Sequence, residues 1–215
     1  MKTIDLTPVL NLCMGSGVGT ATVNGGIHGE TACLVAQAAI LDALRSGRKI
    51  SVPTDKLECA CPILRLFAIR INDTKWWKSD EERTEVLRPL IPLLLDSKVG
   101  LKATKRRGLR YVDCYVREIV PMILDQINQK EAARKLRALL PIIDEQTILS
   151  AREVCAELSL ALDLDRALDR ALALALDRAL DLALARALDL DRALDLRAKF
   201  IELFKELAAI TDDRS

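Results

Sequence analysis

The chain has 215 residues, of which 50% are apolar and only 3% aromatic. Lys and Arg total 32 against 31 Asp and Glu, which leaves a formal net charge of +1. The apolar fraction and the balanced charge exclude a disordered chain. The same balance gives no overall attraction to nucleic acid or anionic lipid, so neither is the expected partner.

No apolar stretch reaches the roughly 18 residues that a membrane span requires. The first residues lack the apolar core of a signal peptide, so we expect a cytoplasmic protein with its six cysteines reduced. The 38 leucines and seven aromatic residues predict a core of Leu, Ala and Ile, which favours helices. The predicted fold class is therefore all-α.

Residues 1–29 are expected to be irregular, because five of their residues between positions 15 and 26 are glycine. Residues 30–147 are expected to form a compact helical bundle that contains most of the cysteines. Residues 148–215 are expected to form a long helical tail, as one helix or a hairpin, that packs on the bundle or on a partner.

Within the bundle, a first helix is predicted from Glu30 to a stop at Ser46–Gly47. Pro62 suits the first turn of a second helix that closes at Asn72–Asp73. Ser79 or Asp80 can cap a third helix, whose first turn is acidic.

Prolines interrupt the rest of the bundle. Pro89 and Pro92 predict a kink or break after the third helix, because an interior proline removes a backbone hydrogen bond. A fourth helix is expected over residues 109–127 with a kink near Pro121. A fifth is expected over residues 129–140, where Pro141 ends it.

Residues 158–196 form a low-complexity repeat. Each even position is Leu or Arg, fifteen and five times respectively, and each odd position is Ala or Asp apart from Ser159. Strict alternation of two kinds of residue is formally a strand pattern. A strand over residues 158–196 would, however, be about 130 Å long at roughly 3.3 Å per residue, which is far beyond ordinary strand lengths. A β-solenoid with a five-residue repeat would need an apolar residue at every inward position. Counting from Leu164 places Asp169 and Asp189 at such positions, so the sequence does not fit this fold. A helix remains, favoured by the high helix propensity of Ala, Leu and Arg.

Such a helix carries an unusual row of leucines. They follow one another every four residues: Leu160, Leu164, Leu168, Leu172, Leu176, Leu180, Leu184 and Leu188. Each step advances about 40° beyond a full turn, so the row winds most of the way around the helix. A solvent-exposed helix keeps its apolar side chains on one face. The repeat therefore predicts burial by other helices, a bend, or association with a protein partner or a second copy.

The cysteines and the only histidine suggest a possible metal site. His28, Cys33, Cys59 and Cys61 offer an imidazole and three thiols, which are ligands that zinc prefers. The Cys59–Cys61 spacing is narrower than that of ordinary zinc knuckles. Free cysteines also serve as small apolar side chains in protein cores. We expect structural cysteines and no cofactor, with zinc or a reactive thiol as alternatives.

Four polar residues complete this possible site. Glu30 and Glu58 could act as a carboxylate pair, although an acid in a first helical turn also stabilises the helix. Asn72 and Asp73 are candidates as well, with a role in ending the second helix as the simpler interpretation.

A basic run follows the prolines. Its members are Lys98, Lys102, Lys105, Arg106, Arg107 and Arg110. A solvated loop is the expected structure, and a patch for anions, an acidic partner or RNA, formed by Lys102 to Arg110, is the functional alternative.

Several motifs resemble those of an uncharacterised family of bacterial and phage-associated helical proteins. The resemblance covers roughly residues 28–150 in motif order. Its motifs are Glu30-Thr31-Ala32-Cys33, Glu58-Cys59-Ala60-Cys61-Pro62, Asn72-Asp73 and Arg88-Pro89-Leu90-Ile91-Pro92. The tail is similar in style to tails of some bacterial NACHT-type defence proteins and of immunity proteins against bacterial toxins. None of these resemblances implies a reaction.

The sequence thus favours a non-enzymatic helical protein–protein interaction module with an immunity- or defence-related role. Its contact segment would be residues 158–196. The alternative is a protein that binds a metal or small molecule through the cysteines, His28, Glu30 and Glu58.

Overall fold

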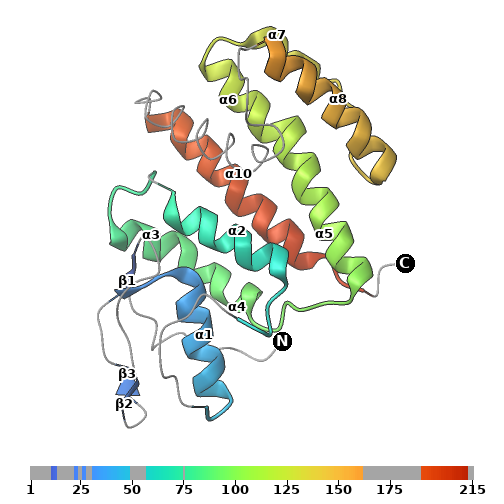
Figure 1. Ribbon diagram of the computed structural model, residues 1–215. Helices are drawn as coiled ribbons and strands as arrows, with labels where there is room; N and C mark the ends of the chain where they lie inside the picture. The colour runs from blue at the N-terminus through green and yellow to red at the C-terminus, as the bar shows by residue number, and fades with distance from the viewer. Residues whose placement is uncertain are drawn as a thin grey trace. The chain divides into compact units, whose positions relative to one another are not determined.

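The computed structural model describes residues 11–13, 22–23, 26–27, 31–48, 57–74, 76–161 and 190–212. In these ranges the chain is helical apart from four strands of two residues each, which confirms the all-α class (Figure 1). The chain divides into two compact units: Met1–Thr104 with Phe204–Ser215, and Lys105–Leu203. The boundaries of these two units differ from those of the three segments that were predicted from composition.

The short strands form two pairs near the N-terminus. They are β1 (Asn11–Leu12), β2 (Thr22–Val23), β3 (Gly26–Ile27) and β4 (Thr31–Ala32). β1 runs parallel to β4, and β2 runs antiparallel to β3. The Gly-rich part of the chain therefore includes local strand pairs.

The helical elements follow. In the first unit they are α1 (Leu34–Arg45), α2 (Pro62–Asp73), α3 (Asp80–Leu87), the 3-10 turn η1 (Arg88–Leu90) and α4 (Ile91–Leu94). After them come α5 (Leu101–Cys114), the π-helical segment η2 (Tyr115–Ile119), α6 (Val120–Gln126), α7 (Lys130–Arg137), α8 (Glu145–Ala161) and α10 (Leu190–Ala209).

Most predicted helix ends are confirmed, but the start predicted at Glu30 is wrong, because Thr31–Ala32 is strand β4 and α1 begins at Leu34. Ser79 is the N-cap of α3, and its hydroxyl accepts a hydrogen bond from the Glu82 amide at 3.2 Å. Pro62 is the first residue of α2, where its missing N–H has no helical partner to lose. Gly47 stops α1 with a φ of +64°, a conformation that favours glycine.

The break predicted after the third helix is confirmed. Pro89 lies in η1, the 3-10 turn that separates α3 from α4. Near Pro121 the helix widens into η2, where the Val120 amide bonds to the Tyr115 carbonyl five residues earlier. This segment lets the helix continue past a proline that cannot donate. The fourth helix begins at Leu101, so the predicted start at residue 109 is wrong.

The core of the first unit lies where α1 packs against α2 and α4. Leu34, Leu64 and Leu94 are fully buried there. The ring of Phe67 in α2 meets that of Phe204 with 5.9 Å between centroids, so the last turns of α10 belong to this core. Trp77 is also buried, and its indole donates to the Ile71 carbonyl at 3.1 Å.

Asn72, at the end of α2, is a fully buried polar residue. Its amide nitrogen donates to the Cys13 carbonyl at 2.8 Å, and its oxygen accepts from the Leu34 amide at 3.2 Å. Leu34 is the first residue of α1, whose N–H has no partner within the helix. One amide therefore satisfies two backbone groups from distant parts of the sequence.

The same N-terminal segment is held from its other side by α3. The Leu12 amide donates to the Thr84 hydroxyl at 2.7 Å, and buried Arg83 donates to the Leu12 carbonyl at 3.4 Å. Arg83 also pairs with Asp80. These hydrogen bonds satisfy backbone groups of Leu12 and Cys13, which compensates for the burial of this part of the backbone.

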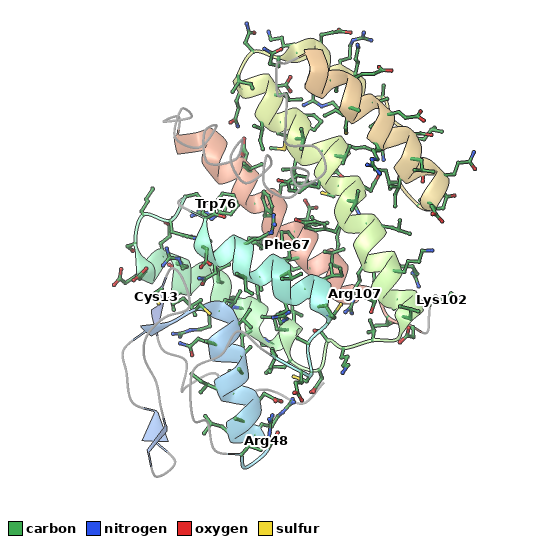
Figure 2. All side chains as sticks on the ribbon, viewed as in Figure 1. Cys13, Arg48, Phe67, Trp76, Lys102 and Arg107 are labelled. Carbon is green, nitrogen blue, oxygen red and sulfur yellow. The ribbon has the colours of Figure 1, made fainter. Side chains whose placement is uncertain are left out.

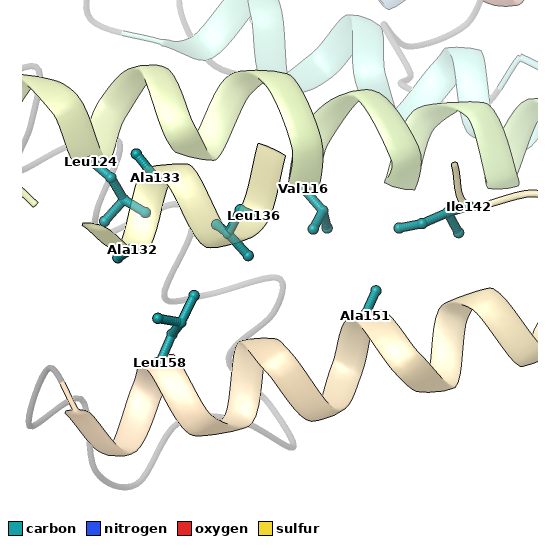
Figure 3. Close-up of a cluster of buried hydrophobic side chains, with 8 residues drawn as sticks. All are labelled: Val116, Leu124, Ala132, Ala133, Leu136, Ile142, Ala151 and Leu158. Carbon is teal, nitrogen blue, oxygen red and sulfur yellow. The ribbon is translucent and has the colours of Figure 1, made fainter. Parts of the chain in front are cut away.

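In the second unit, α7 folds back on α6, and α8 follows α7. Figure 3 shows the buried side chains that join these helices. They are Val116, Leu124, Ala132, Ala133, Leu136, Ile142, Ala151 and Leu158. Half of this cluster is alanine or valine, which lets the helices approach closely.

Most of the low-complexity repeat, residues 162–189, lies outside the described residues. Its two ends are described: α8 ends at Ala161, and α10 begins at Leu190. Leu158 and Leu196 are both buried. The helical prediction is therefore confirmed at both ends of the repeat.

None of the helices in the described ranges has both the length and the apolar character that a membrane crossing demands.

Replacing Asn72 with alanine removes both hydrogen bonds and leaves the Cys13 carbonyl and the Leu34 amide buried without them. We expect Asn72→Ala to lower the free energy of unfolding of the first unit by about 2–4 kcal/mol. Fluorescence during urea denaturation measures this unit alone, because the chain's two tryptophans, Trp76 and Trp77, both lie in it.

The control for this measurement is Lys78→Ala, a change at an exposed residue of the same unit that should shift the stability by about 0.5 kcal/mol or less. Equal denaturation midpoints for the two variants would contradict the role given to Asn72.

Candidate functional site

Two of the candidate cysteines begin helices. Cys33 is the N-cap of α1, where its sulfur accepts a hydrogen bond from the Ala36 amide at 3.4 Å. Cys61 is the N-cap of α2 and is fully buried, and its own amide donates to the Ser97 hydroxyl at 2.9 Å. Burial raises the pKa of the Cys33 thiol despite its position at a helix N-terminus. At Cys33, burial therefore opposes the thiolate character that a helix N-terminus would favour.

The third candidate cysteine has different neighbours. Within the described residues, Cys59 joins Asp42 and Asp96 in a group whose potential ligand atoms all lie within 4.8 Å of one another. Cys33 and Cys61 are not part of this group, and neither is the exposed carboxylate Glu58. His28 and Glu30 lie outside the described residues, so the predicted set is only partly placed.

The three residues of this group come from the end of one helix and from two loop turns. Asp42 lies in the last turns of α1, Cys59 lies in the turn before α2, and Asp96 lies in the turn after α4. The Lys98 amide donates to the Cys59 carbonyl at 2.9 Å and joins two of these turns. Asp96 has a φ of +56°, a left-handed conformation that aspartate tolerates better than most residues.

Two arginines already neutralise the carboxylates. Arg45 contacts Asp96 at 2.6 Å and Asp42 at 2.9 Å, while Arg48 also pairs with Asp42. Asp42 is 8% exposed, and a buried carboxylate near the C-terminal end of a helix needs such cations. We name these five residues, Asp42, Arg45, Arg48, Cys59 and Asp96, the α1-end cluster (Figure 2 labels Arg48).

The electrostatics of the α1-end cluster keep its thiol protonated. Burial is the main cause that raises the pKa of Cys59, and the negative charges of Asp42 and Asp96 raise it further. The hydrogen bonds from Arg45 lower the pKa of Asp96 below its ordinary value. The cluster therefore holds charge pairs and a neutral thiol, which is a poor nucleophile.

Asn72 and Asp73 have the structural roles that the sequence favours. Asn72 donates to the Asp73 carboxylate at 2.8 Å in addition to the backbone bonds described above. These bonds use the whole donor capacity of the Asn72 amide, so Asn72 joins segments of the fold.

The basic run is not a loop, because α5 begins at Leu101 and includes its residues from Lys102 onward. Lys102 and Lys105 are exposed, whereas Arg107 is 1% exposed and its charge lies inside the protein (Figure 2). Lys102 also belongs to the first unit, and Lys105 to Arg110 belong to the second. A patch formed by all five residues stays a prediction.

Arg110 takes part in a network of ion pairs in the second unit. It contacts Asp113 and Glu118, each at 3.1 Å, and Lys199 of α10 contacts Glu118 at 2.7 Å. Burial opposes the ionisation of Glu118, but the hydrogen bonds from Lys199 and Arg110 outweigh it and lower the pKa. Asp113 also accepts from the buried Ile142 amide at 2.9 Å. This part of the basic run therefore stabilises the fold.

Sequence reasoning missed four members of the α1-end cluster. Asp42 carried one signal, since an acid is unfavourable in the last turns of a helix unless a cation compensates for it. Asp96 carried none, because its partner Arg45 lies 51 residues earlier.

No protein-family model, no curated protein and no solved structure matches this chain. The resemblance seen over residues 28–150 therefore stays a prediction.

Asp96 should make the stability of the first unit depend on pH. Its folded-state pKa lies below the ordinary value of 3.8, so its ion pair contributes above that pH and is lost as the pH falls through the folded-state pKa. Asp96→Asn should lower the stability by about 0.2–1 kcal/mol near neutral pH, because the pair is exposed to solvent. The difference from wild type should shrink as the pH falls below 3.8 and vanish once Asp96 is protonated in the folded protein.

Tryptophan fluorescence at a series of pH values measures this difference. Asparagine also tolerates the left-handed conformation, so the variant removes charge without adding backbone strain. Glu58→Gln, at an exposed carboxylate of the same unit, controls for net charge. A difference between wild type and Asp96→Asn that is constant with pH would contradict the ion-pair explanation.

Proposed function

We propose that this chain is a non-enzymatic helical protein–protein interaction module whose contact segment is the repeat at residues 158–196. The observation that carries the proposal is the row of eight leucines at every fourth position from Leu160 to Leu188. In a helix, leucines at this spacing wind around the axis, so one supporting surface would cover only part of the row. The remaining leucines need a second surface, which a partner or another copy supplies.

The ends of the repeat support a helical contact segment. Leu158 belongs to α8 and Leu196 to α10, and both side chains are buried within the described part of the second unit. The described ends of the repeat are thus helical, which supports a helical contact segment.

Exposed apolar residues near the start of α8 extend the surface available for contact. Leu140 is 74% exposed, Ile143 is 68% exposed and Leu149 is 53% exposed. All three belong to the second unit, as does the repeat. Exposed apolar side chains grouped in one region are typical of surfaces that bind other proteins.

The chemistry of the described cysteines supports a non-enzymatic role. Burial raises the pKa of the Cys33, Cys59 and Cys155 thiols, so it disfavours the thiolate that nucleophilic catalysis requires. An immunity- or defence-related role rests on the resemblance alone and stays a prediction.

Two triple variants of the full chain test the contact segment. One replaces leucines of the row and the other replaces the alanines directly before them, in each case with glutamine. The changes are Leu172→Gln, Leu176→Gln and Leu180→Gln, against Ala171→Gln, Ala175→Gln and Ala179→Gln. Glutamine keeps a high helix propensity, so the two variants differ mainly in the apolar area that they remove.

Sedimentation over a range of concentrations and affinity capture should then separate the variants. We expect the leucine variant to lose the association or the captured partner that wild type shows, because three leucines buried by a partner would contribute several kcal/mol. The alanine variant should keep most of the binding. The proposal fails if wild type and both variants behave alike in both measurements.

A second candidate function is metal binding, favoured by the Asp42–Cys59–Asp96 group in place of the predicted His28 and Cys33 set. Thiolate and carboxylate are ligands of zinc. Zinc would have to displace Arg45 and Arg48 from the carboxylates and the proton from Cys59. We therefore expect weak binding that strengthens as the pH rises.

Calorimetric titration of the full chain with zinc checks this candidate. Cys59→Ser should abolish the binding, whereas Cys155→Ser, at a half-buried thiol of the other unit, should leave it unchanged. Equal zinc binding by both variants would exclude the α1-end cluster as the site.

A further inference from the structure

Cys13 and Cys33 occupy matching positions at the ends of two paired strands. The parallel pair β1–β4 aligns Asn11 with Thr31 and Leu12 with Ala32. The next residues in this register are Cys13 and Cys33. The backbone of Cys33 is still extended, with φ of −70° and ψ of 163°, so the alignment continues to it.

The spacing of such partners suits a disulfide. Neighbouring strands lie about 4.7–4.9 Å apart, and disulfides join residues whose Cα atoms are roughly 4.4–6.8 Å apart. Aligned residues of parallel strands also direct their side chains to the same side of the pair. The two thiols are therefore placed on one side of β1 and β4.

Asn72 gives independent evidence that these positions are close. Its amide group bonds to the Cys13 carbonyl at 2.8 Å and to the amide of Leu34, the residue after Cys33, at 3.2 Å. One planar amide spans both contacts, which limits the distance between the two backbones. Figure 2 labels Cys13 beside the N-terminal end of α1.

The two thiols differ in their access to solvent. Cys13 is half-buried, whereas Cys33 is 4% exposed. Burial is the main cause that raises the pKa of Cys33, and the Cys13 thiol is one of the groups that raise it further. This coupling agrees with the short distance that the strand register implies.

We propose that Cys13 and Cys33 are a modification site, a thiol pair that a low-molecular-weight disulfide such as glutathione disulfide converts to an intramolecular disulfide. The proposal does not depend on the function proposed above, because both residues lie in the first unit and the repeat lies in the second.

The reaction has two exchange steps. The more accessible Cys13 sulfur attacks one sulfur of glutathione disulfide, which forms a mixed disulfide and releases one glutathione. The Cys33 sulfur then attacks the Cys13 sulfur of this mixed disulfide and releases the second glutathione. Each protein thiol loses one proton, and each departing glutathione gains one. The protein loses two electrons, which the oxidant takes up.

The product would fasten the N-terminal segment to α1 covalently. The bond closes a loop over residues 14–32 and joins positions that Asn72 already connects through hydrogen bonds. A cross-link of this kind reduces the freedom of the unfolded chain. The oxidised protein should therefore unfold at a higher urea concentration than the reduced protein.

The test uses the full-length reduced protein, glutathione disulfide as the oxidant, and alkylation of the remaining thiols. Cleavage after Glu30 and Glu58 places Cys13, Cys33 and Cys59 on different peptides, so mass spectrometry identifies any linked pair. We expect one linked species that joins the Cys13 and Cys33 peptides and separates on reduction. Its formation should coincide with an increase in the midpoint of tryptophan-monitored unfolding.

Three variants complete the test. Cys13→Ser and Cys33→Ser should each abolish the linked species and the midpoint shift, and serine at position 33 remains a good N-cap for α1. Cys155→Ser should retain both effects. Unfolding curves under reducing conditions check that each variant is folded. The proposal is overturned if every thiol stays alkylatable, if glutathione stays on Cys13, or if Cys13 pairs with another cysteine.

Discussion

The first unit depends on how one buried amide, that of Asn72, satisfies the backbone of two distant segments. The Cys13 carbonyl and the Leu34 amide would otherwise be buried polar groups without these bonds, which is costly in a protein core. Thr84 and Arg83 satisfy the backbone of Leu12 in the same way, because the Thr84 hydroxyl accepts from its amide and Arg83 donates to its carbonyl. Residues 12 and 13 can thus pack beside the helices, because side chains of α2 and α3 bond their backbone groups.

Charged residues meet a similar constraint in both units. The formal charge is nearly zero, and many charges are paired across long stretches of sequence: Arg45 with Asp96 in the first unit, and Glu118 with Lys199 in the second. Exposed pairs of this kind add little stability individually. Their effect is to keep half-buried carboxylates such as Asp42 compensated, which also leaves fewer charges free to attract a charged ligand.

Local signals in the sequence predicted local structure well. Pro62, Ser79 and Gly47 mark helix ends through backbone chemistry that acts within a few residues, and all three are confirmed. The start of α5 was missed because its basic residues resemble a loop, although lysine and arginine are good helix formers. The α1-end cluster was missed for another reason. Its members come from three separate segments of the chain, and no local sequence pattern indicates which segments lie close together in the fold.

The leucine repeat and the thiol pair lie in different units of the chain. The repeat belongs to the second unit, where buried Leu158 and Leu196 anchor its ends, and its apolar area far exceeds what one helix face requires. The thiol pair belongs to the first unit, beside the Asn72 bonds. Because a cross-link there acts on the N-terminal segment and α1, it can change the stability of the first unit without altering the leucines themselves. The binding proposed for the repeat and the oxidation proposed for the thiols can therefore be tested independently in one chain.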